Sequence, residues 1–206
     1  MKLVVVGGHA RNIGKTSVAA AIIAATRDLG WTAFKLTQYG HHVCATDGAA
    51  CECAVTDPVH PFAIDRETSV DGRTDTSRFL AAGAAEAYWA RTPQGGLAEA
   101  LPELRRLMDG KRYVIMESNS ILRFLRPDFY LVVLDSLTTD FKSSARENLD
   151  LADAFLLVEP QAPRAAWENV PVSLIERRPV YRVRPPEYLP PDLLPVLRRV
   201  LSENTR

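Results

Sequence analysis

A glycine-rich turn near the start of the sequence could bind phosphate. Residues 6–17 read Val-Gly-Gly-His-Ala-Arg-Asn-Ile-Gly-Lys-Thr-Ser. Phosphate oxygens need several N–H donors that converge on them, and a glycine-rich turn leading into a helix supplies such donors. We expect Lys15 to reach the β- and γ-phosphate oxygens and the Thr16 hydroxyl to hold Mg²⁺. The residues predicted to contact the nucleotide are Gly8, His9, Ala10, Arg11, Asn12, Ile13, Gly14, Lys15, Thr16 and Ser17.

The turn departs from the strict phosphate-loop pattern at one position, since that pattern has a glycine five residues before Gly14. His9 stands there, and the nearest glycine is Gly8. The context is still the required one, with an apolar run before the turn and a stretch of good helix formers after it. This agreement favours a phosphate site over the alternative that Gly-Lys-Thr merely begins an ordinary helix. Arg11 could add a positive charge near the γ-phosphate, or it could be a solvated loop arginine.

Two further side chains with suitable chemistry lie at the ends of predicted strands. Glu117 comes directly after the apolar run 113–116, where a carboxylate can hold a magnesium-bound water or orient an attacking water. Lys35 lies near the end of a strand predicted at 32–37, and open α/β sheets bind ligands at the carboxyl ends of their strands. There it could stabilise a transferring phosphoryl group. Alternatively, Glu117 is only a polar strand end and Lys35 points outward.

The phosphate turn resembles those of two P-loop families. The pattern Gly8-x5-Gly14-Lys15-Thr16 is similar to the loop of dethiobiotin synthetase, which also carries five residues between its glycines. It is likewise similar to the loop of MobB, the GTP-binding molybdopterin-guanine dinucleotide biosynthesis protein. Both belong to the signal-recognition/MinD/BioD branch of P-loop proteins, although the signature lysine of the MinD members would fall at Ala10. The resemblance covers about the first 120 residues.

The resemblance also implies roles for acidic residues. In these families a glutamate after a strand serves the metal, and in dethiobiotin synthetase so does an aspartate at a helix start; the matching residues here are Glu117 and Asp75. With Thr16 they are the predicted magnesium ligands. Ser118 replaces the glycine that follows the family glutamate, and Asp75 could simply cap its helix. Dethiobiotin synthetase has a lysine near its substrate at the place of Lys35.

A second candidate for chemistry lies within residues 38–73, where regular periodicity fades. All three cysteines fall here, close to two adjacent histidines: Cys44, Cys51, Cys53, His41 and His42. Thiolates and imidazole can form a tetrahedral zinc site, which would order a long loop. The spacing Cys-x6-Cys-x-Cys is not a standard zinc-finger spacing. A structural zinc or other soft metal, a redox or iron–sulfur site, and incidental buried thiols therefore all stay open.

Strands that alternate with helices must position these groups. We predict strands over residues 3–7, 32–37, 113–116, 129–134 and 155–158, with a short strand near 62–64. Helices are predicted over 16–29, 75–91, 97–108, 143–151 and 190–201, and the runs 170–175 and 180–183 could each add a strand. This order predicts an α/β fold, doubly wound, with a mostly parallel sheet flanked by helices, as in P-loop NTPases.

The bulk composition narrows the class of protein. The chain has 206 residues, of which 47% are hydrophobic, enough for one compact domain over 1–206 with an irregular Cys/His insertion at about 38–73. Lys plus Arg equals Asp plus Glu at 25 each, which argues against a protein that mainly coats nucleic acid or an anionic membrane. No segment reaches the roughly 20 apolar residues of a membrane span, and the N-terminal apolar run is too short for a signal peptide. We expect a cytoplasmic protein.

Three functional hypotheses follow. The first is a Mg²⁺-dependent ATP- or GTP-binding NTPase of the MobB type, an accessory factor in cofactor or metal-centre assembly, with a partner enzyme. The second is a small-molecule kinase or ligase like dethiobiotin synthetase, with Lys35 facing the acceptor. The third is a metal-loop binding module with little turnover. No Asn-Lys-x-Asp guanine motif is present, so the base stays open, and residues 134–142 or 182–186 could line its pocket. Relatives of this class often form homodimers.

Overall fold

The computed structural model describes residues 1–39, 62–159, 167, 170 and 172–203. These residues form one eight-stranded sheet of order β3-β4-β2-β5-β1-β6-β7-β8, parallel except for β3, which pairs antiparallel with β4. The strands are β1 (Lys2–Gly8), β2 (Thr32–Tyr39), β3 (Ala63–Arg66), β4 (Glu86–Pro93), β5 (Tyr113–Glu117), β6 (Phe129–Asp135), β7 (Ala154–Val158) and β8 (Val180–Val183).

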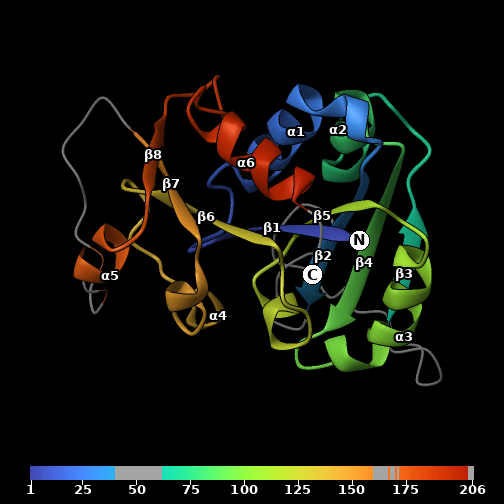
Figure 1. Cartoon of the computed structure of the whole chain (residues 1–206). Coiled ribbons are helices and arrows are strands. Elements are labelled where there is room, and N and C mark those ends of the chain that lie inside the picture. Colours follow the sequence, from blue (N-terminus) through green and yellow to red (C-terminus); the bar gives the residue numbers. More distant parts are fainter. Residues whose placement is uncertain (40–61, 160–166, 168–169, 171, 204–206) are drawn as a thin grey trace.

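Helices cover both faces of this sheet (Figure 1). One face carries α1 (Lys15–Ala25), α2 (Asp75–Ala82) and α6 (Leu193–Ser202), and the other carries α3 (Leu97–Met108), α4 (Ser143–Arg146) and α5 (Val172–Glu176). Short 3-10 helices are η1 (Arg27–Leu29), η2 (Ser120–Arg123) and η3 (Leu149–Leu151). The sheet and its two helical layers confirm the predicted doubly wound α/β fold class.

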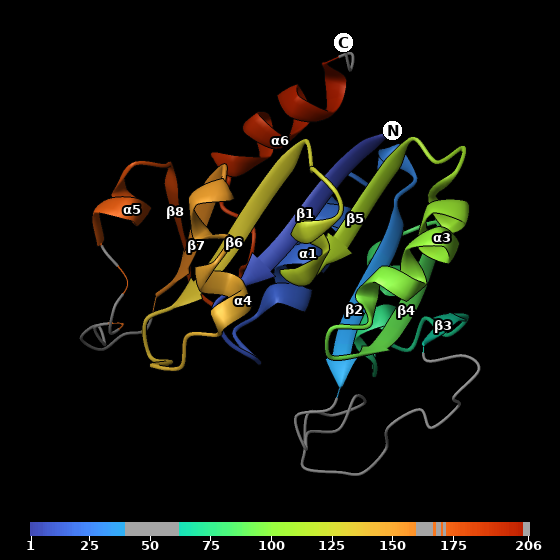
Figure 2. The same ribbon diagram turned by 90° about the horizontal axis from the view of Figure 1, so that it is seen from below.

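The central strand β1 shows why the core has two layers. Val4 and Val6 pack in the apolar cluster under α1 and α6, while Leu3 and Val5 pack in the cluster on the opposite face. Successive strand residues point to opposite faces, so a strand covered by helices on both sides must be apolar throughout. The carboxyl ends of the parallel strands reach the same edge of the sheet (Figure 2). The loops that carry the candidate site leave from that edge.

The structure corrects the long helix predicted over 75–91. Helix α2 ends at Ala82 because Gly83 takes a left-handed conformation, φ 107°, and its N–H bonds back to Leu80. The chain then forms β4, with Ala87 and Ala90 buried in the sheet. The alanines of this stretch favour a helix on intrinsic propensity, so the pairing of this segment with β2 overrode the local preference.

Smaller differences concern the C-terminal half and helix ends. Of the two runs that could have added strands, 180–183 is β8, whereas 172–176 is the helix α5. The predicted helix over 143–151 divides into α4 and η3, and α1 passes at its end into η1. No helix in the described part of the chain has the length and apolarity that a membrane span requires.

Candidate functional site

The phosphate turn lies between β1 and α1, at the carboxyl edge of the sheet. Close packing selects glycine before the turn: a side-chain carbon on Gly7 would lie 2.3 Å from Asn119 Oδ1. At the end of the turn Gly14 has φ 90°, and a side chain there would also meet the ring of Tyr188 at 2.8 Å. Helix α1 begins directly afterwards at Lys15, so its first N–H groups face the turn.

Asn119 fixes the first part of the turn. Its amide group donates to the Gly8 carbonyl and its Oδ1 accepts from the Gly8 N–H, both at 2.9 Å. Asn119 follows Glu117 by two residues, so the acidic strand end and the clamp on the turn come from one connection between β5 and η2. The sequence analysis did not single out Asn119, because an asparagine after a strand is common in ordinary turns.

His9, at the position of the missing glycine, is fully buried. Its Nδ1 lies 2.8 Å from the Asp140 carbonyl, and its Nε2 accepts from the Asp135 N–H at 3.0 Å. These partners require the neutral ring with the proton on Nδ1. Burial lowers the pKa of His9, against the opposing effect of the Asp140 carbonyl. The ring contacts the protein interior and does not line the phosphate cavity, and neither do Gly8 and Ala10.

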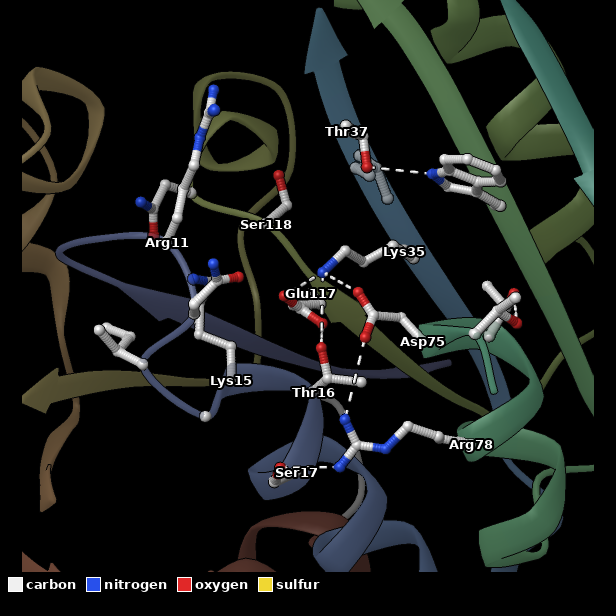
Figure 3. Close-up of a pocket in the computed structure, with 18 of the residues that line it drawn as sticks. Arg11, Lys15, Thr16, Ser17, Lys35, Thr37, Asp75, Arg78, Glu117 and Ser118 are labelled. Atoms are coloured by element: carbon white, nitrogen blue, oxygen red, sulfur yellow. Dashed lines mark hydrogen bonds and ion pairs between the residues drawn. The ribbon is translucent and has the colours of Figure 1, made fainter. Parts of the chain in front are cut away.

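An ion cluster lies beside the turn (Figure 3). Because β5 runs between β1 and β2, Glu117 pairs in register with Lys35. The Lys35 ammonium lies 2.5 Å from Glu117 Oε1 and 2.8 Å from Asp75 Oδ2, and the Thr16 hydroxyl donates to Glu117 Oε2 at 2.7 Å. Four side chains from β2, β5, α1 and α2 thus meet at one point.

The cluster shifts the pKa values of its members. Burial favours a neutral Lys35, but the charges of Glu117 and Asp75 outweigh it and raise the pKa of Lys35 above its usual value. Burial likewise opposes ionisation of Asp75, yet the nearby ammonium lowers the pKa of its carboxyl. Lys35 and Asp75 are therefore both charged at neutral pH.

Helix α2 presents Asp75 to the cluster without using it as a cap. Thr74 is the capping residue: its hydroxyl accepts from the Ser77 N–H at 3.1 Å, and the Ser77 hydroxyl accepts in return from the Thr74 N–H at 2.9 Å. The Asp75 carboxylate is free to face Lys35. Arg78, one turn later, donates to the Ser17 hydroxyl at 2.8 Å and so links α2 to α1. Arg78 was not anticipated from the sequence, because only the packing of the two helices brings it here.

A cavity of about 700 Å³ opens over the turn and the ion cluster. From the turn it is lined by Arg11, Asn12, Ile13, Gly14, Lys15, Thr16 and Ser17. The Lys15 ammonium turns back to the Ala10 carbonyl at 2.6 Å, and burial lowers the pKa of Lys15 to about 8. Arg11 extends from the turn and lines the same cavity as Ser118 (Figure 3). Beyond Lys35 the cavity is lined by Thr37, Gln38, Trp89 and Ser120.

A second cavity of about 400 Å³ adjoins the end of the turn. Its walls include Asp135 at the end of β6, Leu137 just after that strand, Glu159 after β7 and Arg184 after β8. Tyr188 lines both cavities. The two loops predicted to border a base or substrate pocket, 134–142 and 182–186, therefore both contribute to this wall.

The predicted zinc residues His41, His42, Cys44, Cys51 and Cys53 lie outside the described residues. Within the described ranges no group of three or more His, Cys, Asp or Glu side chains could hold a metal ion by itself.

Comparison with known proteins adds little beyond the fold. No family model and no curated protein matches the sequence. Among solved structures the chain is similar to LpxK from Aquifex aeolicus in complex with ATP, at 12% identity and a TM-score of 0.46 over 88% of this chain and 53% of that one. It is also similar to HypB from Helicobacter pylori in complex with nickel, at 13% identity and a TM-score of 0.44 over 96% and 84%. The chain spans about half the length of LpxK.

Proposed function

We propose that the protein binds a magnesium–nucleoside triphosphate and cleaves its terminal phosphoanhydride bond. The observation that carries the proposal is the meeting of Thr16, Lys35, Asp75 and Glu117 at the first turn of α1, beside a glycine turn that ends in Lys15. Water would attack the γ-phosphorus, the bond to the β-phosphate oxygen would break, and the products would be a nucleoside diphosphate and inorganic phosphate. The N–H groups of the turn and Lys15 would stabilise the charge that builds up on the phosphate oxygens.

The donors in the cluster suit magnesium. A hydroxyl and two carboxylates are hard oxygen ligands, and magnesium in such sites keeps several waters and takes phosphate oxygens as further ligands. Thr16, Asp75 and Glu117 would hold the ion, which when bound polarises the phosphate oxygens. One oxygen of each of these three side chains lies within hydrogen-bonding distance of the Lys35 ammonium. The longest of the three distances is 3.5 Å, to the Thr16 hydroxyl. A divalent ion among these oxygens would replace the Lys35 ammonium as their counter-ion and free it for a phosphate oxygen.

The second cavity is the proposed compartment for the base. It adjoins Gly14 at the end of the phosphate turn and is closed on one side by the Tyr188 ring, which could stack on a purine. The carboxylates that line it already have partners: Asp135 accepts from the Leu137 N–H, and Glu159 is paired with Arg182 and Arg184. ATP and GTP are both proposed ligands.

The biological role we propose is that of a MobB-like accessory factor in cofactor or metal-centre assembly, located in the cytoplasm and acting with a partner enzyme. A small-molecule kinase or ligase is the second candidate. One feature supports it: the main cavity continues past Lys35 to Thr37, Gln38 and Trp89, a polar wall beyond the phosphate turn. An acceptor bound there would face the ammonium of Lys35.

Calorimetry of the full chain with Mg²⁺ and either ATP or GTP tests the first proposal. Lys15→Ala should weaken binding by at least about 100-fold, because it removes a buried charge that contacts phosphate. Lys111→Met is the matched control, since it removes an ammonium paired with Glu86, at the opposite end of β5 from the site. Wild-type affinity in Lys15→Ala would refute the proposal. Phosphate release without added acceptor supports the NTPase, whereas turnover only with an acceptor supports the kinase.

A further inference from the structure

Lys142 is a basic side chain in the phosphate cavity that neither the motif nor the ion cluster uses. It lies after β6, on the opposite side of the turn from Lys35, and its side chain lines the main cavity together with Ser144. Within the described part of the chain no carboxylate forms an ion pair with it, whereas Lys35, Lys111 and Lys2 are each paired. A largely buried ammonium without a counter-ion is unfavourable unless an anion arrives to pair with it.

His9 holds the segment that carries this lysine. Its N–H donates to the Val133 carbonyl, its ring bonds to the Asp135 N–H and the Asp140 carbonyl, and its own carbonyl accepts from the Lys142 N–H at 2.8 Å. One residue of the phosphate turn thereby contacts both ends of the connection from β6 to α4. The Phe141 and Trp167 rings pack against the imidazole, with ring centroids 5.0 and 5.3 Å from the centroid of the imidazole. These contacts fix the orientation of the His9 ring.

This arrangement explains a histidine where the strict pattern has glycine. A glycine would leave the connection after β6 without its two ring hydrogen bonds. Both ring nitrogens of His9 form hydrogen bonds with that connection, and the buried ring does not enter the cavity. The departure from the motif thus comes with an additional basic side chain, Lys142, on the segment that the histidine ring holds.

We propose that Lys142 is a further ligand for the anionic end of the bound nucleotide, and that His9 positions it. The inference rests on the proposed nucleotide site and adds a contact from the β6 side of the turn. The cavity lining is already strongly cationic: its charged side chains are Arg11, Lys15, Lys35, Arg73, Arg78 and Lys142 against Asp75 and Glu117. Such a surplus suits a polyphosphate, whose oxygens face both sides of the turn.

Proton uptake gives this contact its own signature. Burial, then the charges of Lys15 and Arg11, lower the pKa of Lys142 to about 7, with Lys35 acting in the same sense and Asp140 opposing. At pH 7 the free amine is therefore roughly half protonated, and an anion would complete the protonation. Lys15, whose pKa is lowered only to about 8, is mostly protonated at that pH and contributes less to the uptake.

The test is calorimetry at pH 7 in two buffers of different ionisation enthalpy, with Mg²⁺–ATP and Mg²⁺–ADP. Wild type should take up roughly half a proton or more on binding. Lys142→Met should lose most of that uptake and weaken ATP binding at least about tenfold, while Lys142→Arg keeps the affinity. A larger loss for ATP than for ADP would assign the contact to the γ-phosphate, and equal losses to the β-phosphate. Wild-type affinity and uptake in Lys142→Met would overturn the proposal.

The positioning role of His9 is tested by a double-mutant cycle. His9→Phe keeps a ring in the interior but cannot bond to Asp135 or Asp140, so it should weaken binding about as much as Lys142→Met. The double variant should then be no weaker than either single variant. Additive losses would overturn the positioning role, and if His9→Phe does not fold, His9→Asn is used in its place. If wild type binds no nucleotide, the proposed function itself fails; if Lys15→Ala abolishes binding but Lys142→Met does not affect it, only this inference fails.

Discussion

The two sides of the phosphate turn are held by different chemistry. On the β5 side, Glu117, Lys35 and Asp75 form a cluster of full charges around the Thr16 hydroxyl. On the β6 side, neutral His9 is fixed by hydrogen bonds and ring contacts. A cluster of charges can exchange one counter-ion for another, whereas a neutral clamp has only one arrangement that satisfies its donors and acceptors. We therefore expect the β5 side to rearrange when a ligand binds and the β6 side to keep its arrangement.

The largest effect should follow from breaking the charged side. Glu117→Ala leaves the mostly buried Lys35 ammonium with only the partly exposed Asp75 as a partner, so the free energy of unfolding should fall by about 3 kcal/mol, the low end of the cost of breaking a buried ion pair. Urea unfolding measures this change. Glu147→Ala is the matched control, because it removes a glutamate from an exposed pair with Arg123 and should cost less than about 1 kcal/mol. Equal losses in the two variants would show that the cluster is not a buried unit.

A smaller loss is expected on the neutral side, with a distinct pH dependence. His9→Phe leaves the Asp135 N–H and the Asp140 carbonyl unpaired and should cost about 2 kcal/mol at pH 7.5. Because the pKa of His9 is lowered in the folded state, the unfolded chain binds more protons below about pH 6.5. Wild-type stability should therefore fall as the pH drops from 6.5 to 5.5, and the variant should fall less. If the free energy of unfolding changes equally with pH in wild type and in His9→Phe, titration of His9 does not cause the pH dependence.

Asn119 is a neutral side chain on the otherwise charged β5 side of the turn. Its substitution therefore shows whether a loss of stability depends on the charge of a group or on the side of the turn where it lies. Asn119→Ala removes both hydrogen bonds to the Gly8 peptide and should cost about 1–2 kcal/mol in unfolding experiments. The loss should be the same with and without Mg²⁺. If added Mg²⁺ changes it, the neutral contacts are not independent of the charged cluster.

Asp75→Asn should have the smallest effect on stability, under about 1 kcal/mol, because its carboxylate is 42% exposed. Its effect on ligand binding should be selective: calorimetry should show weaker nucleotide binding in Mg²⁺ and little change in EDTA. Thr74→Ala is a useful comparison, since it removes the helix cap next to Asp75 and leaves the carboxylate in place. Loss of Mg²⁺ dependence in Thr74→Ala as well would point to helix placement and not to the carboxylate.

The sequence was most informative where a local pattern and the fold agree. The strand before the turn and the helix after it could be predicted because a β-branched apolar run and a stretch of good helix formers are strong local signals. Glu117 and Lys35 fall at strand ends that the register places side by side. The strand β4 could not be predicted, since its alanines fit a helix and only pairing with β2 selects the strand.

Contacts made by residues distant in sequence were harder to predict. Arg78, Asn119 and Tyr188 face the site because of helix packing and loop paths that no spacing encodes. His9 was predicted as a nucleotide contact because of its place in the turn, but its ring is directed to the interior by partners more than 100 residues away. A motif identifies the backbone path of such a turn more securely than the direction of each side chain.

The covalently attached ammonium of Lys35 affects whether Mg²⁺ would bind to the cluster alone or together with a nucleotide. An amine held within 3 Å of both carboxylates competes with any dissolved cation at a very high effective concentration. Free Mg²⁺ alone should therefore displace it poorly. Under the proposed function, a metal ion already chelated by a nucleotide would arrive with additional attractive contacts, so we expect that complex to displace the Lys35 ammonium more readily than the bare ion does. Selectivity for the complex over the bare ion would then come from a single lysine.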